Sequence, residues 1–514
     1  MRWIPWTVPG VGPESAKSGS GGRALAAVVI AMLALGLGSA MEVGVLVATL
    51  GLFNVGVVLF LLLRRDITWG FLFYLTAVIF FQTGFWIRLP NFPDLYPARI
   101  VSTLLYLIFL IQVLIGMRRV PRLSGVERNM IVFLIVLFIS VVTSGQQPRW
   151  LMILRGYVYP FMFFYFARTV INRDRQIAIV LGYLVLIGLY LGVMGIFEKA
   201  KLYSLIWPQF IVDESLRDTG LSRLGFRVRG IFLQPAILGT VMAMGFFPAW
   251  YVLSRQGGII RRVAQLGLVL VTPPVLFFTQ TRSVYAGFAV ALITGAIWGR
   301  RLRVLCLALL LFAMVGVFLN WDNMATDDRD RGGLMVTNTI EFRAVLFMEA
   351  MEVFADHPFF GCGFMNFPEL AMQYRRPRDV PLFGHIDLGV GGHAIPHNIF
   401  LTIIAEQGIA GILPYFLIFW LMFRTSIRAY RGLGREGLVS KDLVVCIWCG
   451  IAAYMVNAMF LEMRYFEYVN VLFFFLMGTV AGMEDRLRAQ AGSSGPDLTP
   501  YPVPAMFSAS GRGE

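Results

Sequence analysis

A histidine and an asparagine lie where a long polar segment of the chain meets a strongly apolar one. Pro396-His397-Asn398 closes the polar segment, and an apolar stretch begins at Ile399. Ionisable groups are costly at the boundary of an apolar helix, so this junction is a candidate site. A histidine titrates at about pH 6.5 when unperturbed, which suits proton abstraction at neutral pH. We therefore predict His397 as a general base, against the alternative of a structural polar contact.

The helix expected after this junction carries a carboxylate at Glu406. A rise of ~1.5 Å per residue places that carboxylate roughly 13 Å along the helix from the histidine. Gly408 and Gly411 follow it closely. We expect Glu406 to hold a buried polar partner or to bend the helix together with these glycines. Asn398, Glu406, Gly408 and Gly411 are therefore predicted to support the site.

Three arginines in separate segments are candidates for binding an anion beside the histidine. Arg282 lies in a short polar interruption between two apolar spans, and Arg229 precedes another apolar span. Arg343 lies near the start of residues 341–354, whose apolar spacing predicts an amphipathic helix. A guanidinium stays charged and can hold phosphate oxygens in a bidentate manner. The alternatives are an arginine facing lipid headgroups at Arg282 and a surface ion pair at Arg343. Convergence of the three would create a site for a polyanion.

The composition predicts a membrane protein. Of the 514 residues, 58% are hydrophobic and 14% are charged, whereas about a quarter are charged in ordinary soluble proteins. We expect about fourteen apolar segments long enough to cross a ~30 Å hydrocarbon core, which makes the fold class an all-α polytopic membrane protein. These segments are expected at residues 24–39, 43–63, 67–87, 100–117, 129–143, 151–170, 176–197, 231–253, 263–279, 283–298, 304–320, 398–423, 443–461 and 466–483.

The net charge of +14 follows from the placement of basic clusters in alternate loops, so it indicates loops on the cytoplasmic side and not nucleic-acid binding. This pattern predicts that both termini are cytoplasmic and that the candidate site faces the opposite side. The expected organisation is a cytoplasmic tail (1–23), an N-terminal transmembrane bundle (24–197), an outer loop (198–230), transmembrane helices with the arginine hairpin (231–320), a large outer loop with surface helices between transmembrane helices 11 and 12 (321–397), C-terminal transmembrane helices (398–483) and a disordered cytoplasmic tail (484–514).

Three histidines near the same junction raise the alternative of a metal site. His385, His393 and His397 lie close together in the sequence, but their spacing matches no helix-borne zinc pair and no thiol is near them. The acidic run at residues 327–330 contains an arginine and is typical of a solvated turn. We therefore predict neither a metal nor a cofactor.

The candidate residues occur in an order that is typical of one family. The matching residues are Arg229-Gly230 with Pro235, Thr281-Arg282-Ser283, Arg343 with His357-Pro358, Gly361 and Gly363, and His397-Asn398 with Gly408 and Gly411. They resemble the O-antigen ligase and polymerase superfamily of bacterial inner-membrane glycosyltransferases. The resemblance covers roughly the last three-fifths of the chain, and the N-terminal third is similar only in being transmembrane.

The resemblance implies a glycosyltransferase C-type membrane fold that works without metal at the periplasmic face. It implies an undecaprenyl-diphosphate-linked glycan as donor and inversion at the transferred sugar. His397 would be the base or would position the acceptor, and Arg282, Arg343 and Arg229 would bind the lipid diphosphate. The implied partners are a glycan or lipid-linked acceptor and the flippase and chain-length regulator of a polysaccharide assembly system.

Several activities remain open within this resemblance. We favour a polymerase of surface or exopolysaccharide repeat units, because the arginine-rich first outer loop offers a second surface for a lipid-linked acceptor. An O-antigen ligase that transfers glycan to lipid A core and a protein O-oligosaccharyltransferase are the alternatives. Outside this class, a lipid-linked sugar flippase or transporter would place charges near the membrane midplane and show repeated halves, and neither feature is evident in the sequence.

Overall fold

The computed structural model describes residues 67–81, 97–116, 121–143, 150–171, 173–212, 227–255, 257–319, 321–324, 337–380, 384–386 and 396–493. Within these ranges the protein is an all-α, multi-pass membrane protein. Eight described helices are long and apolar enough to cross a membrane, and three shorter apolar helices accompany them. The expected segments at 24–39 and 43–63 lie outside the described residues.

The bundle helices follow the apolar segments of the sequence. Each expected segment from 67–87 onward contains a helix, and the run at 150–170 contains a π-helical turn. The bundle helices are α3 (Thr68–Phe80), α4 (Pro97–Leu114), α5 (Gly125–Thr143), α6 (Trp150–Ile153), η2 (Leu154–Val158), α7 (Tyr159–Val170), α8 (Asp174–Lys199), α9 (Pro235–Ser254), α10 (Ile259–Phe278), α11 (Arg282–Trp298), α12 (Arg303–Leu319), α16 (Ile399–Gly432), α17 (Lys441–Ala458) and α18 (Glu467–Ser493). The last helix continues past the expected apolar segment, so residues 484–493 are helical, whereas they were expected to be disordered.

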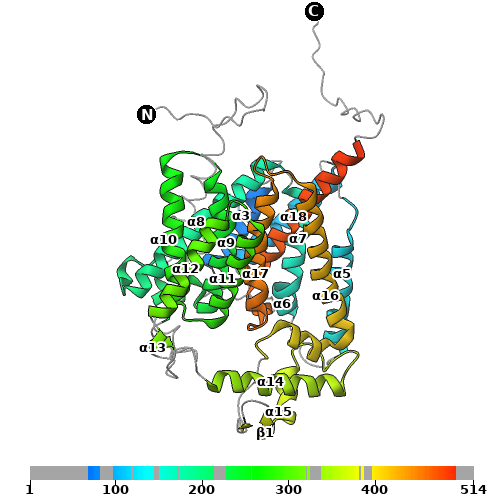
Figure 1. Cartoon of the computed structure of the whole chain (residues 1–514). Coiled ribbons are helices and arrows are strands. Elements are labelled where there is room, and N and C mark those ends of the chain that lie inside the picture. The colour runs from blue at the N-terminus through cyan, green and yellow to red at the C-terminus, as the bar shows by residue number, and fades with distance from the viewer. Residues whose placement is uncertain are drawn as a thin grey trace, which may run out of the picture.

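The helices lie closely side by side in the bundle (Figure 1), and small residues allow this packing. α18 packs along α7, and α17 lies against both α9 and α11. A Cβ atom on Gly478 would lie 2.2 Å from the carbonyl oxygen of Phe164, and one on Gly482 would lie 2.9 Å from that of Arg168. Glycines spaced four residues apart thus let the backbones of α18 and α7 touch, as is common between membrane helices.

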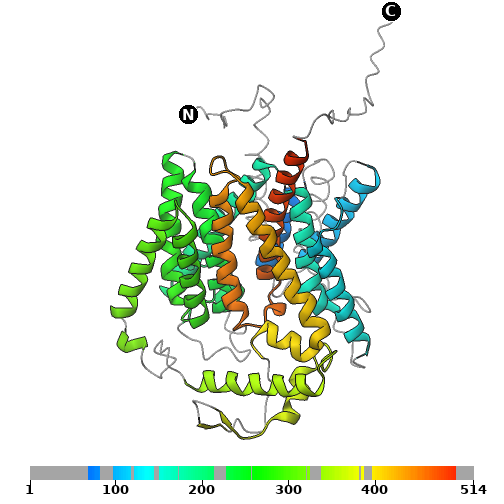
Figure 2. The same ribbon diagram turned by 45° about the vertical axis from the view of Figure 1, so that its right-hand side comes forward.

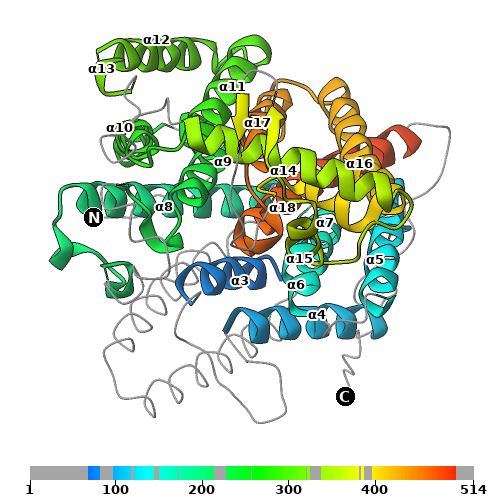
Figure 3. The same ribbon diagram turned by 90° about the horizontal axis from the view of Figure 1, so that it is seen from below.

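The segment between α12 and α16 covers one end of the bundle. Its elements are α13 (Trp321–Met324), α14 (Thr337–Asp356), α15 (Phe367–Tyr374), and the antiparallel strands β1 (Arg378–Val380) and β2 (Gly384–Ile386). We call residues 337–380 and 384–386 the cap. The amphipathic helix predicted over 341–354 is present as α14, which lies crosswise beneath α16 and α17 (Figures 2 and 3). The two-stranded sheet was not predicted.

α16 is broken one-quarter of the way along its length. Its 34 residues would extend roughly 51 Å as one helix, well beyond a ~30 Å hydrocarbon core. Gly408 has φ 60° and ψ −153°, which interrupts the helix. The part before the break runs along the cap and the longer part rises through the bundle (Figure 2). Leu401 and Ala405 of the first part accordingly pack with Val353 and Phe367 of the cap.

Candidate active site

The break in α16 is stabilised by a turn of the cap. Residues 358–363 and residues 405–410 exchange four backbone hydrogen bonds of 2.8–3.0 Å across the break. These bonds use N–H and C=O groups that an unbroken helix would pair internally. The cap is therefore joined to α16 by main-chain bonds at the point where the helix changes direction.

Two glycines make this junction possible. A Cβ on Gly361 would lie 2.2 Å from the carbonyl carbon of Glu406, and one on Gly408 would lie 2.5 Å from the carbonyl oxygen of Pro358. Both glycines also have positive φ, 67° and 60°, where a side chain is disfavoured. Gly411 is buried in the continuing helix, where a Cβ would lie 2.3 Å from Cβ of Gln407. Gly408 and Gly361 thus form the hinge between the cap and the membrane helix, whereas the predicted supporting residue Gly411 lies in the helix beyond it.

His397 lies at the entrance of the first part of α16. Asn398 caps the helix, and its side-chain oxygen accepts hydrogen bonds from the backbone N–H of Phe400 at 2.9 Å and of Leu401 at 3.1 Å. His397 itself has a positive φ of 52°, an uncommon conformation for a residue with a side chain. The side-chain bonds of Asn398 and this backbone conformation together fix the direction in which the His397 side chain projects.

The surroundings of His397 favour its neutral form. The residue remains exposed, yet removal of water by nearby protein lowers the pKa of His397, and the Arg343 guanidinium lowers it further. A neutral imidazole at neutral pH can accept a proton. The structure therefore brings the predicted histidine into the electrostatic field of one predicted arginine.

Arg343 connects the cap to the end of α17. Its Nη2 donates to the carbonyl oxygen of Phe460 at 3.4 Å, and its guanidinium lies 5.4 Å from the centre of the Phe460 ring. The cationic side chain is thus held where α14, the entrance of α16 and the loop after α17 meet.

Arg282 and Arg229 belong to two segments that are bonded together. Arg282 is the first residue of α11. Arg227, two positions before Arg229, donates from Nε to the carbonyl oxygen of Thr279 at 2.8 Å and from Nη2 to Oγ1 of Thr281 at 2.5 Å. The segment carrying Arg229 is therefore fastened to the hairpin that carries Arg282.

A half-buried carboxylate fixes the backbone at Arg229. The oxygens of Glu198 accept hydrogen bonds from the N–H of Arg229 at 3.1 and 3.2 Å and from the N–H of Gly230 at 2.8 Å. Arg229 is 8% exposed. Arg229 is therefore a largely buried cation, whereas Arg282 is only half-buried.

All four predicted groups lie at the capped end of the bundle. α11 starts there, since a Cβ on Gly287 would lie 3.0 Å from the carbonyl oxygen of Ala453, near the end of α17. Phe460, in the loop that follows α17, accepts a hydrogen bond from Arg343. Figure 1 shows the starts of α11 and α16 on the side of the bundle that faces α14.

A buried ionic cluster beside this end was not predicted. Arg464 pairs with Glu406 through two bonds, 2.5 Å from Nη1 to Oε2 and 3.0 Å from Nη2 to Oε1. Its Nε also lies 3.4 Å from Oε1 of Glu462. All three residues are at most 2% exposed. We call Glu406, Glu462 and Arg464 the ionic triad. Arg464 sits in a short polar interruption between two apolar runs, the same signal that singled out Arg282.

The triad joins four segments of the chain. Glu406 also accepts a hydrogen bond from the backbone N–H of Met365 in the cap, at 2.9 Å. A Cβ on Gly156, in the π-helical turn η2, would lie 3.0 Å from the carbonyl oxygen of Arg464. Arg464 thus connects the first part of α16, the cap, the π-helical turn and the loop before α18.

Side chains that could bind a metal ion do not cluster in the described ranges. No group of three or more His, Cys, Asp or Glu side chains there could hold a metal ion. His385 pairs with Asp379 at 3.0 Å on the exposed cap sheet. His393 and the acidic run at 327–330 lie outside the described residues.

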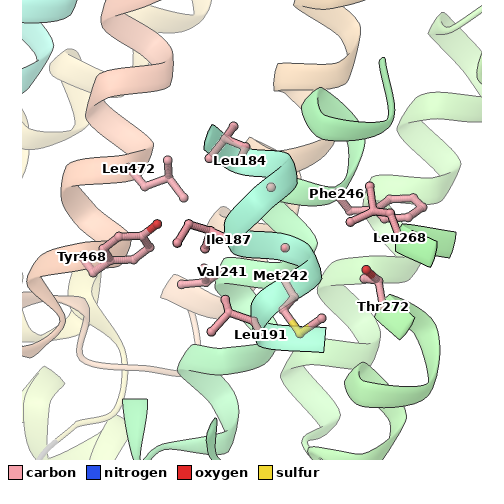
Figure 4. Close-up of a pocket in the computed structure, with 12 residues that line it drawn as sticks. Leu184, Ile187, Leu191, Val241, Met242, Phe246, Leu268, Thr272, Tyr468 and Leu472 are labelled. Atoms are coloured by element: carbon pink, nitrogen blue, oxygen red, sulfur yellow. The ribbon is translucent and has the colours of Figure 1, made fainter. Parts of the chain in front are cut away.

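A small cavity lies inside the bundle between α8, α9, α10 and α18 (Figure 4). Its volume of about 10 Å³ has room for roughly one water molecule. Apolar side chains such as Leu191 and Met242 line it, with the polar groups of Thr272 and Tyr468. Because none of its lining residues is charged, this cavity is not the anion site expected from the arginines.

Comparison with known proteins identifies part of the chain. Residues 266–416 match the family model described as O-Antigen ligase, and no curated protein matches the chain. The matched range includes Arg282, Arg343, His397 and the broken part of α16, whereas Arg229 and Arg464 lie outside it.

Proposed function

We propose that this multi-pass membrane protein, which carries an O-antigen ligase domain at residues 266–416, polymerises the repeat units of a surface or secreted polysaccharide. The domain indicates a glycosyltransferase-type enzyme with lipid-linked glycan substrates. The proposed donor is a glycan on undecaprenyl diphosphate, and the proposed acceptor is a second lipid-linked glycan. The site would face the periplasm, in a glycosyltransferase C-type bundle of about fourteen membrane helices.

In the proposed reaction, the imidazole of His397 accepts the proton of an acceptor hydroxyl. The hydroxyl oxygen then forms a bond with the anomeric carbon of the donor sugar on the face opposite the diphosphate. The bond from that carbon to the diphosphate oxygen breaks with its electron pair, so the configuration inverts and undecaprenyl diphosphate leaves. The leaving group needs no proton, because a diphosphate is already a weak base.

The arginines act on the leaving group. Arg343 and Arg282 are proposed to hold the diphosphate oxygens and to stabilise the charge that grows on them in the transition state. Arg229 would add to the positive potential from a largely buried position. This arrangement supplies the charge stabilisation without a metal ion. The observation that carries the proposal is a histidine favoured in its neutral form beside a cap arginine, at the end of the bundle where the other arginines also lie.

Replacement of His397 tests the proposal. Purified His397→Ala protein in detergent should lose about 10²–10⁴-fold in transfer rate, the usual contribution of a general base. His385→Ala is the matched control, because His385 pairs with Asp379 on the exposed cap sheet. Full activity of the His397→Ala protein would end the assignment of the base. Activity in detergent would also exclude a transporter, because transport needs a sealed membrane.

The arginine assignment has its own test. Arg282→Lys keeps the positive charge but loses the planar fork that binds two phosphate oxygens. We expect the transfer rate of Arg282→Lys to fall by more than about tenfold. A rate equal to that of the unmodified protein would remove Arg282 from the diphosphate site.

The family description favours a second candidate function, that of a ligase that transfers finished glycan to an acceptor such as lipid A core. Glycan analysis of a deletion strain separates the two. Loss of chain length indicates a polymerase, whereas full-length chains left on the lipid carrier indicate a ligase. Glycan missing from proteins alone would indicate a protein glycosyltransferase.

A further inference from the structure

A hydrogen-bond chain links the ionic triad to the entrance of α16. The hydroxyl of Thr402 lies within hydrogen-bond distance of Oε2 of Glu462 and 3.0 Å from the carbonyl oxygen of Asn398. Asn398 is the residue directly after His397 and caps the helix. A buried carboxyl group outside the family-matched range is therefore two hydrogen bonds away from the backbone that carries the proposed base.

The chain of bonds can be complete in only one protonation state. A hydroxyl has a single hydrogen, so Thr402 donates either to the Asn398 carbonyl or to Glu462. If Glu462 is protonated, its O–H donates to Thr402, and Thr402 donates to Asn398. If Glu462 is ionised, the carboxylate takes the Thr402 hydrogen, and the Asn398 carbonyl keeps only its bond from the backbone N–H of Thr402.

The charge balance of the triad favours the protonated state. Arg464 already has two close bonds to Glu406, so an ionised Glu462 would leave the buried cluster with one excess negative charge. An uncompensated buried charge is costly. Burial raises the pKa of Glu462 to about 7, and Glu406 contributes to the increase, while Arg464 and the bond to Thr402 oppose it.

Titratable and charged side chains of α16, the π-helical turn and its own loop surround Glu462. Glu462 is 2% exposed, so these groups and not solvent set its protonation. The titratable and charged side chains that interact electrostatically with it are Arg464, Glu406, Tyr157, Tyr415 and Tyr465.

We propose that Glu462 is a positioning residue of the transferase, and that its protonated form fixes the helix entrance behind His397 through Thr402 and Asn398. The proposal rests on the proposed function, because positioning matters only if His397 is the base. It predicts that transfer requires a neutral His397 and a neutral Glu462 at the same time. Activity should therefore rise with pH as His397 loses its proton and fall again as Glu462 loses its own.

The pH profile of Glu462→Gln tests this. An amide can donate to Thr402 at every pH, so the variant should keep its activity at alkaline pH, and at pH 8.5 it should exceed the unmodified protein by about fivefold or more. Glu352→Gln is the control, because this carboxylate pairs with Arg376 on the cap surface and its replacement should leave the profile unchanged. Identical alkaline limbs for Glu462→Gln and the unmodified protein would overturn the proposal.

Thr402 provides an independent test. Thr402→Val removes the hydroxyl, and we expect kcat to fall by about tenfold to a hundredfold, the scale of a small misplacement of a catalytic group, with KM unchanged. Thr402→Ser keeps the hydroxyl and should restore kcat. If Thr402→Val and Thr402→Ser behave alike, the hydrogen-bond chain has no role.

Amide hydrogen exchange separates this proposal from the proposed function. In the protein without substrate, peptides covering residues 397–407 should lose protection between pH 6 and pH 8.5, after correction for intrinsic exchange. Glu462→Gln should retain protection over the same range. Unchanged protection in the unmodified protein overturns the positioning role, even if transfer is observed. The expected exchange pattern without transfer overturns the proposed function and leaves the structural coupling established.

Discussion

Arg464 is expected to be essential for the stability of the capped end. In Arg464→Met the two bonds to Glu406, of 2.5 and 3.0 Å, are lost. Glu406 and Glu462 then remain in a site where they are 0% and 2% exposed. Water cannot replace the guanidinium there, so Glu406 must take up a proton, as Glu462 already has, or the site must open.

The size of the expected loss of stability follows from the burial of all three groups. Removing one partner of a buried ion pair costs about 3–5 kcal/mol, because it leaves a charge that nothing compensates. The matched control is Arg376→Met. Arg376 and Glu352 are also 3.0 Å apart, but the arginine side chain is 70% exposed. A solvent-exposed pair of this kind contributes less than about 1 kcal/mol.

Thermal unfolding of the purified proteins in detergent measures the difference, with the 11 tryptophans as the fluorescence signal. Arg464→Met should unfold at a clearly lower temperature than Arg376→Met. The double variant Arg464→Met with Glu406→Gln should recover part of the loss, because it removes the carboxylate that Arg464 otherwise neutralises. Equal melting temperatures for the two arginine variants would refute the claim that Arg464 and Glu406 form a buried ion pair.

Three further predictions concern the same end of the molecule. The pKa of Glu462 is raised by burial to about 7, above its unfolded value, so its protonation stabilises the fold at low pH. That contribution to the free energy of unfolding, about 3 kcal/mol, is lost as pH rises toward 7. In Glu462→Gln the melting temperature should therefore depend less on pH than in the unmodified protein. Gly408→Ala should lower the free energy of unfolding by more than about 2 kcal/mol, since its Cβ would lie 2.5 Å from a carbonyl oxygen at positive φ. By contrast, Gly182→Ala, with open space around its Cβ, should be neutral or stabilising on a melting curve. Arg227→Met removes the bonds that fasten the hairpin of Arg282 and should raise KM for the lipid-linked donor more than it lowers kcat.

The membrane helices could be predicted from the sequence because hydrophobicity alone determines them. Each apolar run from 67–87 onward contains a helix, and the amphipathic segment 341–354 is present as α14. The apolar segment was expected to end at 483, but α18 continues to Ser493. Residues 484–493 include several charged side chains, so hydrophobicity could not predict this extension. One of these charged residues, Asp485, pairs with Arg168 of α7 at 2.6 Å, which supplies the tertiary contact that extends the helix.

The site could be predicted only in part, because residue type and spacing do not specify partners. Glu406 was expected to have a buried polar partner, but the sequence could not identify Arg464, which lies 58 positions away. The hinge at Gly408 was expected as a bend, whereas the strong break depends on the backbone bonds offered by residues 358–363 of the cap. Those bonds form between segments that are remote in the sequence and carry no side-chain signal.

The ionic triad is better explained by geometry than by stability. Well-packed apolar side chains can often replace a buried ion pair without loss of stability, so stability alone does not account for three charged groups in this position. Apolar contacts are not directional, and they would let the first part of α16 slide or rotate against the cap. The bonds of Glu406 to Arg464 and to the backbone of Met365 fix both the distance and the orientation of that segment. Since His397 lies at its entrance, errors in the angle of the segment would move the imidazole relative to Arg343, and the triad holds that angle.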